Sequence, residues 1–174
     1  MSLPDTLSLV PVLAEHMAAV DYLHVKTVES PQTLREFAAA CLSYMPGWMR
    51  YLYRVRGWFV RLLGTRQEEV PCKKDIAPEQ LLFRPGDMGA FFTVLDGEEE
   101  RFWIGEARDG MIAGHLAFVR EPGPDGLNRF HLVTAATYLR WQARIYFTVI
   151  RPFHHLVVHT MARHALAEAK RRGA

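Results

Sequence analysis

The sequence has few cysteines, little net charge and no long uninterrupted apolar run. Its two cysteines, Cys41 and Cys72, belong to no CxxC or Cys–His pattern, so we expect buried thiols rather than disulfides or a zinc site. The 21 Lys and Arg residues and 19 Asp and Glu residues leave a net charge of +2, too small to indicate a nucleic-acid-binding protein. The longest apolar stretch, residues 145–161, is interrupted by Arg151 and Pro152 and is shorter than the roughly 20 residues of a membrane-spanning helix.

Signatures of targeting and of common enzyme chemistry are also missing. Residues 1–20 have neither a basic segment nor a continuous apolar segment, so they do not resemble a secretion signal. The chain has no nucleophile elbow, P-loop, dinucleotide-binding glycine motif, zinc ribbon or paired-carboxylate signature. We therefore expect a cytoplasmic protein that uses no cofactor or metal ion and binds no nucleic acid.

The composition that is present is typical of a globular protein. Hydrophobic residues make up 49% of the chain and charged residues 23%, close to the averages for soluble proteins. A chain of 174 residues can bury one sizeable core but is short for two domains. We expect a single domain spanning residues 1–174.

The first third of the chain predicts one strand and two helices. Residues 20–28 alternate in polarity, which favours a strand. Ser30 and Pro31 then form a helix start, and the predicted helix runs to Ser43 with one apolar face. A second helix is predicted from Pro46 to Gly64, where glycine can form a left-handed cap.

The remaining sequence predicts an antiparallel meander and a closing helix. Strand-like runs cover residues 88–95, 101–108, 111–119 and 129–137, and the Asp96-Gly97 and Asp109-Gly110 pairs are typical of hairpin turns. Residues 138–150 are predicted to form one more strand, and Pro152 to begin a helix that continues through Lys170.

The predicted element order, β-α-α-β(5–6)-α, indicates an α+β fold. An antiparallel sheet needs cover on one face, and the long C-terminal helix is available to supply it. We therefore expect a curved antiparallel sheet wrapped around that helix, a helix-grip arrangement. Curvature around a single helix often leaves a space suited to a ligand. The alternation does not decide which sheet face is inward.

Arginines divide the predicted second helix into two arcs. Arg50, Arg54 and Arg61 share one narrow arc, whereas Arg56 alone interrupts the wide apolar arc. Arg56 is either a ligand contact for a carboxylate or phosphate, or a structural residue whose stem packs while its head pairs with a carboxylate such as Asp21 or reaches water.

The wide apolar arc of this helix also has two interpretations. The helix could lie on an anionic membrane surface, where Trp48 and Trp58 would suit the interface. Burial between the sheet and a neighbouring helix explains the same arc and is the commoner cause.

Histidines and aromatic residues supply the other candidates for a site. His154 is predicted in the first turn of the closing helix, where the helix dipole favours a neutral ring that can bond a ligand or act as a base. His115 and His131 lie on strands and could face the same space. His155 and His159 are four residues apart, but no third ligand accompanies them, so we reject a metal site. The aromatic residues expected to line or fill the space are Phe91, Trp103, Phe118, Phe130 and Tyr146.

Three stretches of the sequence together resemble a bacterial family of proteins of unknown function. They are Asp21-Tyr22, the run Pro46-x-Trp48-x-x-x-Leu52-x-x-x-Arg56 that ends at Gly64, and Pro152-Phe153-His154 followed by Met161. Members of that family occur alone or behind epimerase-like domains and are grouped with the START-like, helix-grip superfamily, also called SRPBCC. The resemblance implies a hydrophobic cavity for lipids, sterols, polyketides or other small apolar ligands, in some members with catalysis.

These predictions lead to three hypotheses about the function. The leading hypothesis is binding of a small apolar ligand between the sheet and the C-terminal helix. The second is an enzyme of the same fold, a cyclase, dehydratase or hydrolase acting on a hydrophobic substrate, with His154 as the catalytic base. The third is a membrane-surface or protein-interaction module that uses the basic, aromatic second helix. A weak membrane contact and a homodimer both stay open. The expected ligand contacts are Arg56, Trp103, His115, Tyr146 and His154.

Overall fold

The computed structural model describes residues 10–62 and 76–172 and contains one six-stranded antiparallel sheet. The strand order is β1-β6-β5-β4-β3-β2, with every neighbouring pair antiparallel. The elements are α2 (Pro11–His16), β1 (Tyr22–Ser30), α3 (Leu34–Ser43), α4 (Gly47–Leu62), η1 (Pro78–Gln80), β2 (Met88–Gly89), β3 (Phe92–Glu98), β4 (Phe102–Arg108), β5 (Ile112–Pro122), η2 (Pro124–Gly126), β6 (Asn128–Tyr138) and α5 (Gln142–Arg172).

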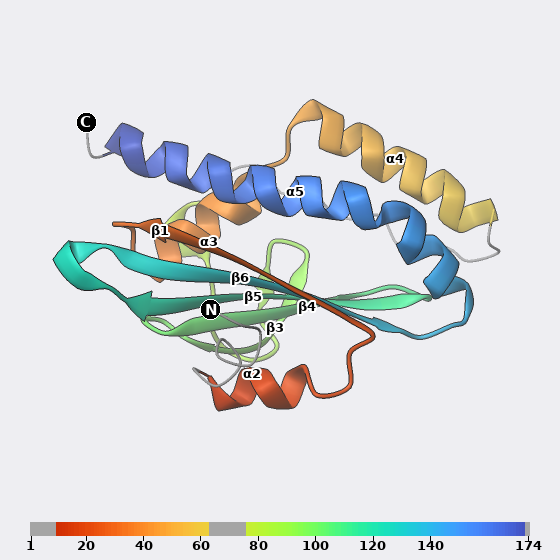
Figure 1. Cartoon of the computed structure of the whole chain (residues 1–174), viewed down its shortest axis with the longest axis horizontal. Helices are drawn as coiled ribbons and strands as arrows, with labels where there is room; N and C mark the ends of the chain where they lie inside the picture. Colours follow the sequence, from red (N-terminus) through yellow and green to blue (C-terminus); the bar gives the residue numbers. More distant parts are fainter. Residues whose placement is uncertain (1–9, 63–75, 173–174) are drawn as a thin grey trace.

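The helices are distributed unequally over the two faces of the sheet. Figure 1 shows the long helix α5 running across one face, with α3 and α4 on the same side and the short helix α2 on the other. The curved sheet does not close into a barrel. The predicted α+β fold, a curved sheet around a long C-terminal helix, is confirmed.

Side-chain alternation along β6 defines the two faces. Phe130 and Leu132 pack in the cluster that includes α3 and α5, so we call this the inner face. Val133 and Ala135 pack with residues of α2, so the opposite side is the α2 face. Because side chains alternate along a strand, each sheet position can be assigned to one of these two faces.

The cap of α3 differs from the prediction. Thr33, not Ser30, is the N-cap residue, and its side chain and that of Glu36 form a reciprocal capping box. Ser30 still belongs to β1, where it pairs with Asn128, and its hydroxyl donates to the side chain of Gln32. The Ser-Pro signal therefore lies three residues before the true cap.

The predicted strand at residues 138–150 is wrong, because Tyr138 ends β6 and residues 142–150 form the N-terminal turns of α5. The helix begins at Gln142, ten residues before the predicted start, and Pro152 lies inside it. Proline removes one helical hydrogen bond and clashes with the carbonyl four residues earlier, which bends a helix. The first turns of α5 accordingly descend toward the sheet at an angle to the rest of the helix (Figure 1).

The turns of the meander follow the prediction in part. Asp109 and Gly110 do connect β4 and β5. Asp96 and Gly97 instead lie within β3, where the register shifts between Val94 and Asp96. That shift is a bulge-like irregularity, and Gly97 lies where an added Cβ would be 2.9 Å from the backbone oxygen of Phe83, so the glycine allows a close approach rather than a hairpin turn.

Two further expectations concern the helices and the cysteines. Cys41 is a fully buried thiol in α3, as predicted, and burial raises its pKa. Cys72 and the predicted helix end at Gly64 lie outside the described residues. Within the described ranges, we find no helix that is both long and apolar enough to cross a membrane.

Candidate ligand cavity

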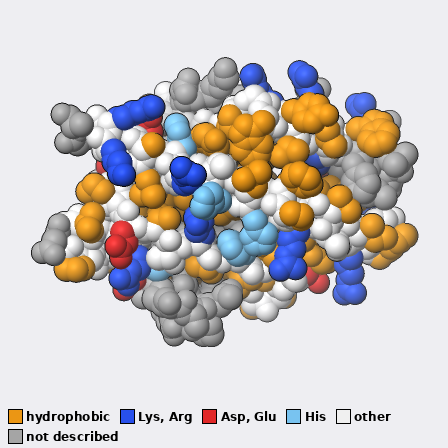
Figure 2. All heavy atoms as spheres, turned by 45° about the horizontal axis from the view of Figure 1, so that its top comes forward, with side chains coloured by type: hydrophobic (Ala, Val, Ile, Leu, Met, Phe, Trp, Pro, Cys, Tyr) orange, Lys and Arg blue, Asp and Glu red, His pale blue; other side chains and the backbone are white. Residues whose placement is uncertain are grey.

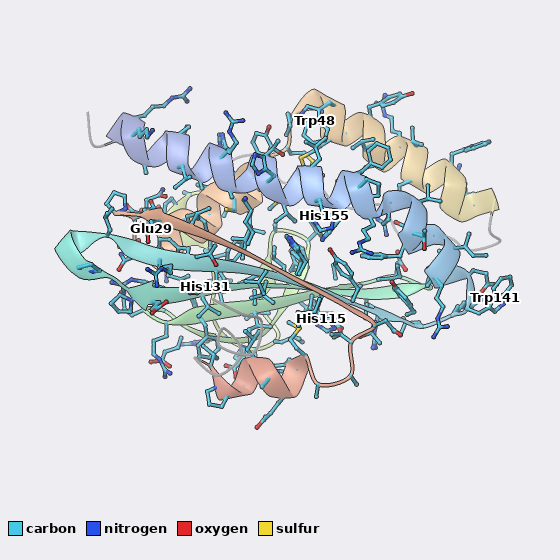
Figure 3. All side chains as sticks on the ribbon, in the orientation of Figure 1. Glu29, Trp48, His115, His131, Trp141 and His155 are labelled. Atoms are coloured by element: carbon cyan, nitrogen blue, oxygen red, sulfur yellow. The ribbon has the colours of Figure 1, made fainter. Side chains whose placement is uncertain are left out.

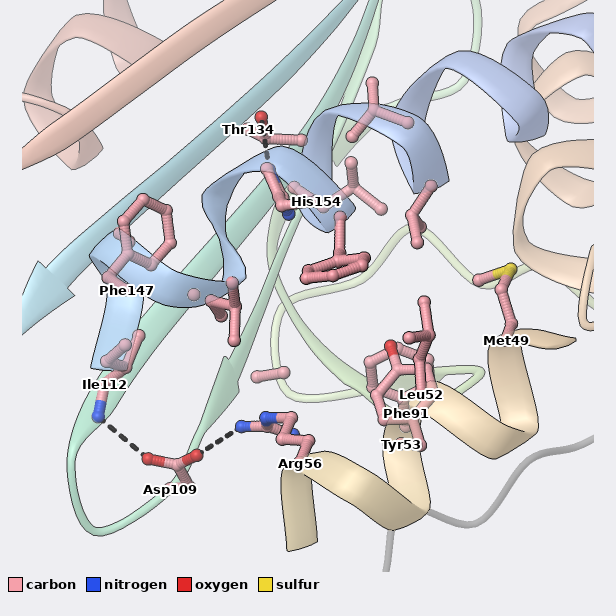
Figure 4. A pocket seen from close by; sticks show the side chains of 18 of the residues that line it. Met49, Leu52, Tyr53, Arg56, Phe91, Asp109, Ile112, Thr134, Phe147 and His154 are labelled. Carbon is pink, nitrogen blue, oxygen red and sulfur yellow. Dashed lines mark hydrogen bonds and ion pairs between the residues drawn. The ribbon is translucent and has the colours of Figure 1, made fainter. Parts of the chain in front are cut away.

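A cavity of about 500 Å³ lies between the inner face of the sheet, α4 and the N-terminal half of α5. Ligand pockets for small molecules commonly have volumes in the range of about 300–1,000 Å³. Figure 4 shows α4 and α5 on opposite sides of the space, with the β4–β5 turn at one end. Its apolar walls include Met49, Leu52, Phe91, Ile112, Phe147, Ile150, Val157 and Met161.

The cavity exists because the inward-facing side chains become smaller along the central strands. On the inner face of β6, Phe130 and Leu132 are followed by Thr134 and Ala136. On β5, Phe118 and Leu116 are followed by Gly114, which lines the cavity. A Cβ atom added at Gly114 would meet only the backbone oxygen of Ala107, at 3.6 Å.

Arg56 connects α4 to the sheet at one end of the cavity. Its Nε donates to the hydroxyl of Tyr146 on α5, and its Nη2 donates to Oδ2 of Asp109 at 2.5 Å. The other oxygen of Asp109 accepts hydrogen bonds from the backbone N–H groups of Met111 and Ile112, both at 2.8 Å. The predicted pairing of Arg56 with Asp21 is wrong, because Asp21 instead accepts from the backbone of Tyr138.

Arg56, Tyr146 and Asp109 form a charge-balanced cluster in the apolar wall of the cavity. Burial by itself lowers the pKa of Arg56, but Tyr146 and Asp109 outweigh it, so the net pKa is raised and the guanidinium stays charged. Burial raises the pKa of Tyr146, and the nearby Arg56 only partly opposes this, so the phenol stays protonated at neutral pH. The cation of Arg56 is therefore compensated by the carboxylate of Asp109 rather than left for an anionic ligand.

His154 supplies a neutral polar group elsewhere on the cavity wall. Its Nε2 lies 3.1 Å from Oγ1 of Thr134 (Figure 4). Its pKa falls to about 4, chiefly because of burial and further because His155 and His24 are close. His154 lies well inside α5, so the predicted helix-terminus effect does not operate. At neutral pH the ring offers one N–H donor and one nitrogen acceptor.

His115 and His131 lie on the α2 face. His115 belongs to the cavity floor, but alternation places its imidazole opposite Leu116, on the side of the sheet toward α2 (Figure 3). Its Nε2 lies 3.7 Å from Glu106. His131 is fully buried between Thr27 and Glu121, at 3.0 and 3.2 Å. Neither imidazole is directed into the cavity.

Trp103 lies in the packed part of the inner face. It is fully buried, and its indole N–H donates to the backbone oxygen of Leu82. Phe118 and Phe130 pack in the same cluster, whereas Phe91 lines the cavity. Of the five predicted ligand contacts, the structure thus brings Arg56, Tyr146 and His154 together around one space.

Sequence reasoning missed Asp109 and Thr134 as site residues. The sequence indicates Asp109 only as a turn residue, and the ion pair with Arg56 joins positions 53 residues apart. Thr134 follows Leu132 on the inner face of β6, so its polar position on an otherwise apolar strand face was the available signal. Neither contact is visible without knowing which sheet face is inward.

The fold and the site define an α+β domain with an apolar cavity between a curved sheet and its covering helices. The chain belongs to the DUF2867 family, described as proteins of unknown function, whose family model matches residues 15–161. No curated protein matches the chain.

Among solved structures, the chain is similar to the Mll3558 protein from Rhizobium loti, a structural genomics target. The two share 13% sequence identity, and the match covers 82% of this chain and 96% of the other, with a TM-score of 0.39.

Proposed function

We propose that this protein is a START-like domain that binds a small apolar ligand carrying one uncharged polar group. The observation that carries the proposal is the unfilled cavity of about 500 Å³, whose walls are mostly apolar. Leaving such space open sacrifices packing energy, which a bound ligand would restore.

The polar groups on the wall select the chemistry of the ligand. Arg56 is already paired with Asp109, and His154 is neutral at physiological pH. A carboxylate or phosphate would therefore lose its hydration without gaining an unpaired cation, which is costly in an apolar site. A hydroxyl or carbonyl group can instead exchange hydrogen bonds with His154 and Thr134, which already lie within bonding distance of each other.

The same features favour binding over catalysis by His154. A general base works best when its pKa is near the working pH, and a pKa of about 4 makes the imidazole a weak base. As a hydrogen-bonding group, however, a permanently neutral ring is well suited to orienting an uncharged ligand.

The proposal is tested with decan-1-ol and decanoate, which differ in their polar group. Each is titrated against a neutral fluorescent probe, N-phenyl-1-naphthylamine, bound to the purified protein. We expect decan-1-ol to displace the probe and decanoate to bind at least about 10-fold more weakly at pH 7, because its charge is buried without a free partner.

Gly114→Leu is the matched blocking variant, since the new side chain would extend into the cavity. It should weaken decan-1-ol binding by about 10-fold or more. Gly110→Leu, in the exposed β4–β5 turn, where an added Cβ meets nothing within 4 Å, is the control and should bind normally. Equal binding by both variants would refute the cavity as the binding site.

A further inference from the structure

Two exposed apolar stripes run along α4 and α5. On α4, Tyr51 and Trp58 are 66% and 67% exposed, and Val55 lies between them at helical spacing. On α5, four large apolar side chains at spacings of three or four residues are about half exposed: Ile145, Val149, Phe153 and Leu156. Contiguous exposed apolar surface of this kind marks an interaction site. The predicted burial of the whole apolar arc of α4 is therefore wrong for this stripe.

The mouth of the cavity opens between these stripes. Val55 and Trp58 of α4, and Val149 and Phe153 of α5, are exposed and also line the cavity. These four side chains extend the apolar wall of the cavity to the surface. Whatever covers this face also covers the mouth.

The helix segments that border the mouth carry only basic charged residues, and one of these, Arg56, is paired with Asp109 at one end of the cavity. Residues 47–62 contain four arginines and no Asp or Glu, and residues 142–167 contain three arginines and no Asp or Glu. On the wheel of α4, the exposed Arg50, Arg54 and Arg61 form an arc directly beside the stripe of Tyr51 and Trp58. Figure 2 shows apolar side chains gathered over α4 and α5 with Lys and Arg side chains around them.

We propose that the α4–α5 face docks onto an anionic lipid bilayer, with the cavity mouth against the membrane. Aromatic and aliphatic side chains next to arginines fit the boundary between lipid headgroups and acyl chains. A second copy of this chain fits less well, because a two-fold contact would place the arginines of one copy against those of the other. Docking goes beyond the proposed function and does not require it, but it gives an apolar ligand a route that avoids water.

The proposal is tested by co-sedimentation of the full chain with vesicles. One set contains about 30% phosphatidylglycerol in phosphatidylcholine and the other phosphatidylcholine alone. We expect binding to the anionic vesicles at about 0.1 M salt, and clear weakening at about 0.5 M salt because the charges are screened. Absence of binding to anionic vesicles at the lower salt would overturn the proposal.

Two sets of variants distinguish the effect of charge on α4 from the effect of the same loss of charge elsewhere on the surface. Arg50→Gln, Arg54→Gln and Arg61→Gln together remove three exposed charges from α4 and should weaken binding by about 100-fold, since each basic residue contributes about 1 kcal/mol near an anionic surface. Arg84→Gln, Arg101→Gln and Arg129→Gln remove three surface charges outside α4 and α5, of which Arg84 and Arg101 are exposed and Arg129 is half-buried, and should have little effect. Equal losses from the two sets would refute the assignment of the face.

The apolar stripe has its own test in Tyr51→Glu, which lies on the stripe but does not line the cavity. It should reduce vesicle binding by about 10-fold or more while decan-1-ol binding without vesicles stays unchanged. Unchanged vesicle binding, or a dimer formed by the wild type and lost in Tyr51→Glu, would contradict membrane docking. Because decan-1-ol binding is measured separately, failure of the docking proposal and failure of the cavity proposal are distinguishable.

Discussion

The inner face of the sheet is filled at one end and hollow at the other. At the filled end, under α3, Phe37 stacks on Phe130 with ring centroids 4.3 Å apart, and Phe118 and Trp103 complete the packing. At the hollow end, under α4, the strands present Gly114, Ala136 and Thr134 instead. The same strands build both ends, so the smaller strand side chains at the hollow end account for the open space there.

The largest expected effect compares one substitution at each end. Phe130→Ala should destabilise the protein by about 3–5 kcal/mol, because it opens a new void in a close-packed cluster. Phe91→Ala should cost about half as much or less, since Phe91 already borders open space. Urea unfolding of both variants measures the difference, and equal losses would show that the two ends are packed alike.

The second prediction concerns pH and the hollow end. The folded-state pKa of His154, about 4, lies below its ordinary value of 6.5, so the unfolded chain binds more protons between these two values. Stability should therefore fall as the pH drops from about 6.5 to about 4, by up to about 3 kcal/mol from this residue.

Unfolding free energies measured across that pH range test this expectation in two variants. His154→Gln should flatten the profile, whereas His159→Gln, on the exposed side of α5, should leave it unchanged. A profile that is equally steep in both variants would show that other groups cause the acid sensitivity.

The smallest expected effect has opposite signs at the two ends. Gly105→Ala should destabilise by about 1–3 kcal/mol, because the new Cβ would lie 2.8 Å from Cβ of Phe92 and against the indole of Trp103. Gly114→Ala should be neutral or stabilising by up to about 1 kcal/mol, because the new methyl group enters open space and stiffens the unfolded chain. Thermal unfolding of both variants measures the two effects. A loss of stability in both would show that the sheet is packed closely at Gly114 as well.

The fold was predictable because most of its signals are local. Alternation identified β1, and proline and helical spacing placed α3 and α4. The N-terminal part of α5 was missed because Pro152 resembles a helix start, while the packing of α5 against the sheet tolerates that proline inside the helix.

The sequence could predict single residues of the site but not the contacts between them. The wheel of α4 singled out Arg56, whereas Tyr146 was predicted on a strand and His154 on the closing helix, and both instead line the cavity from one helix, α5. The partner of Arg56 was not predictable, since Asp109 reaches it only through the tertiary fold. His115 was misplaced because the alternation of β5 does not reveal which face the long helix covers.

The most direct test of the open cavity is native mass spectrometry after incubation with decan-1-ol. We expect a one-to-one noncovalent adduct with the wild type and with Gly110→Leu, lost on denaturation, and a much smaller fraction of adduct with Gly114→Leu. A wild-type mass without adduct at saturating decan-1-ol, or equal adducts in all three proteins, would contradict it.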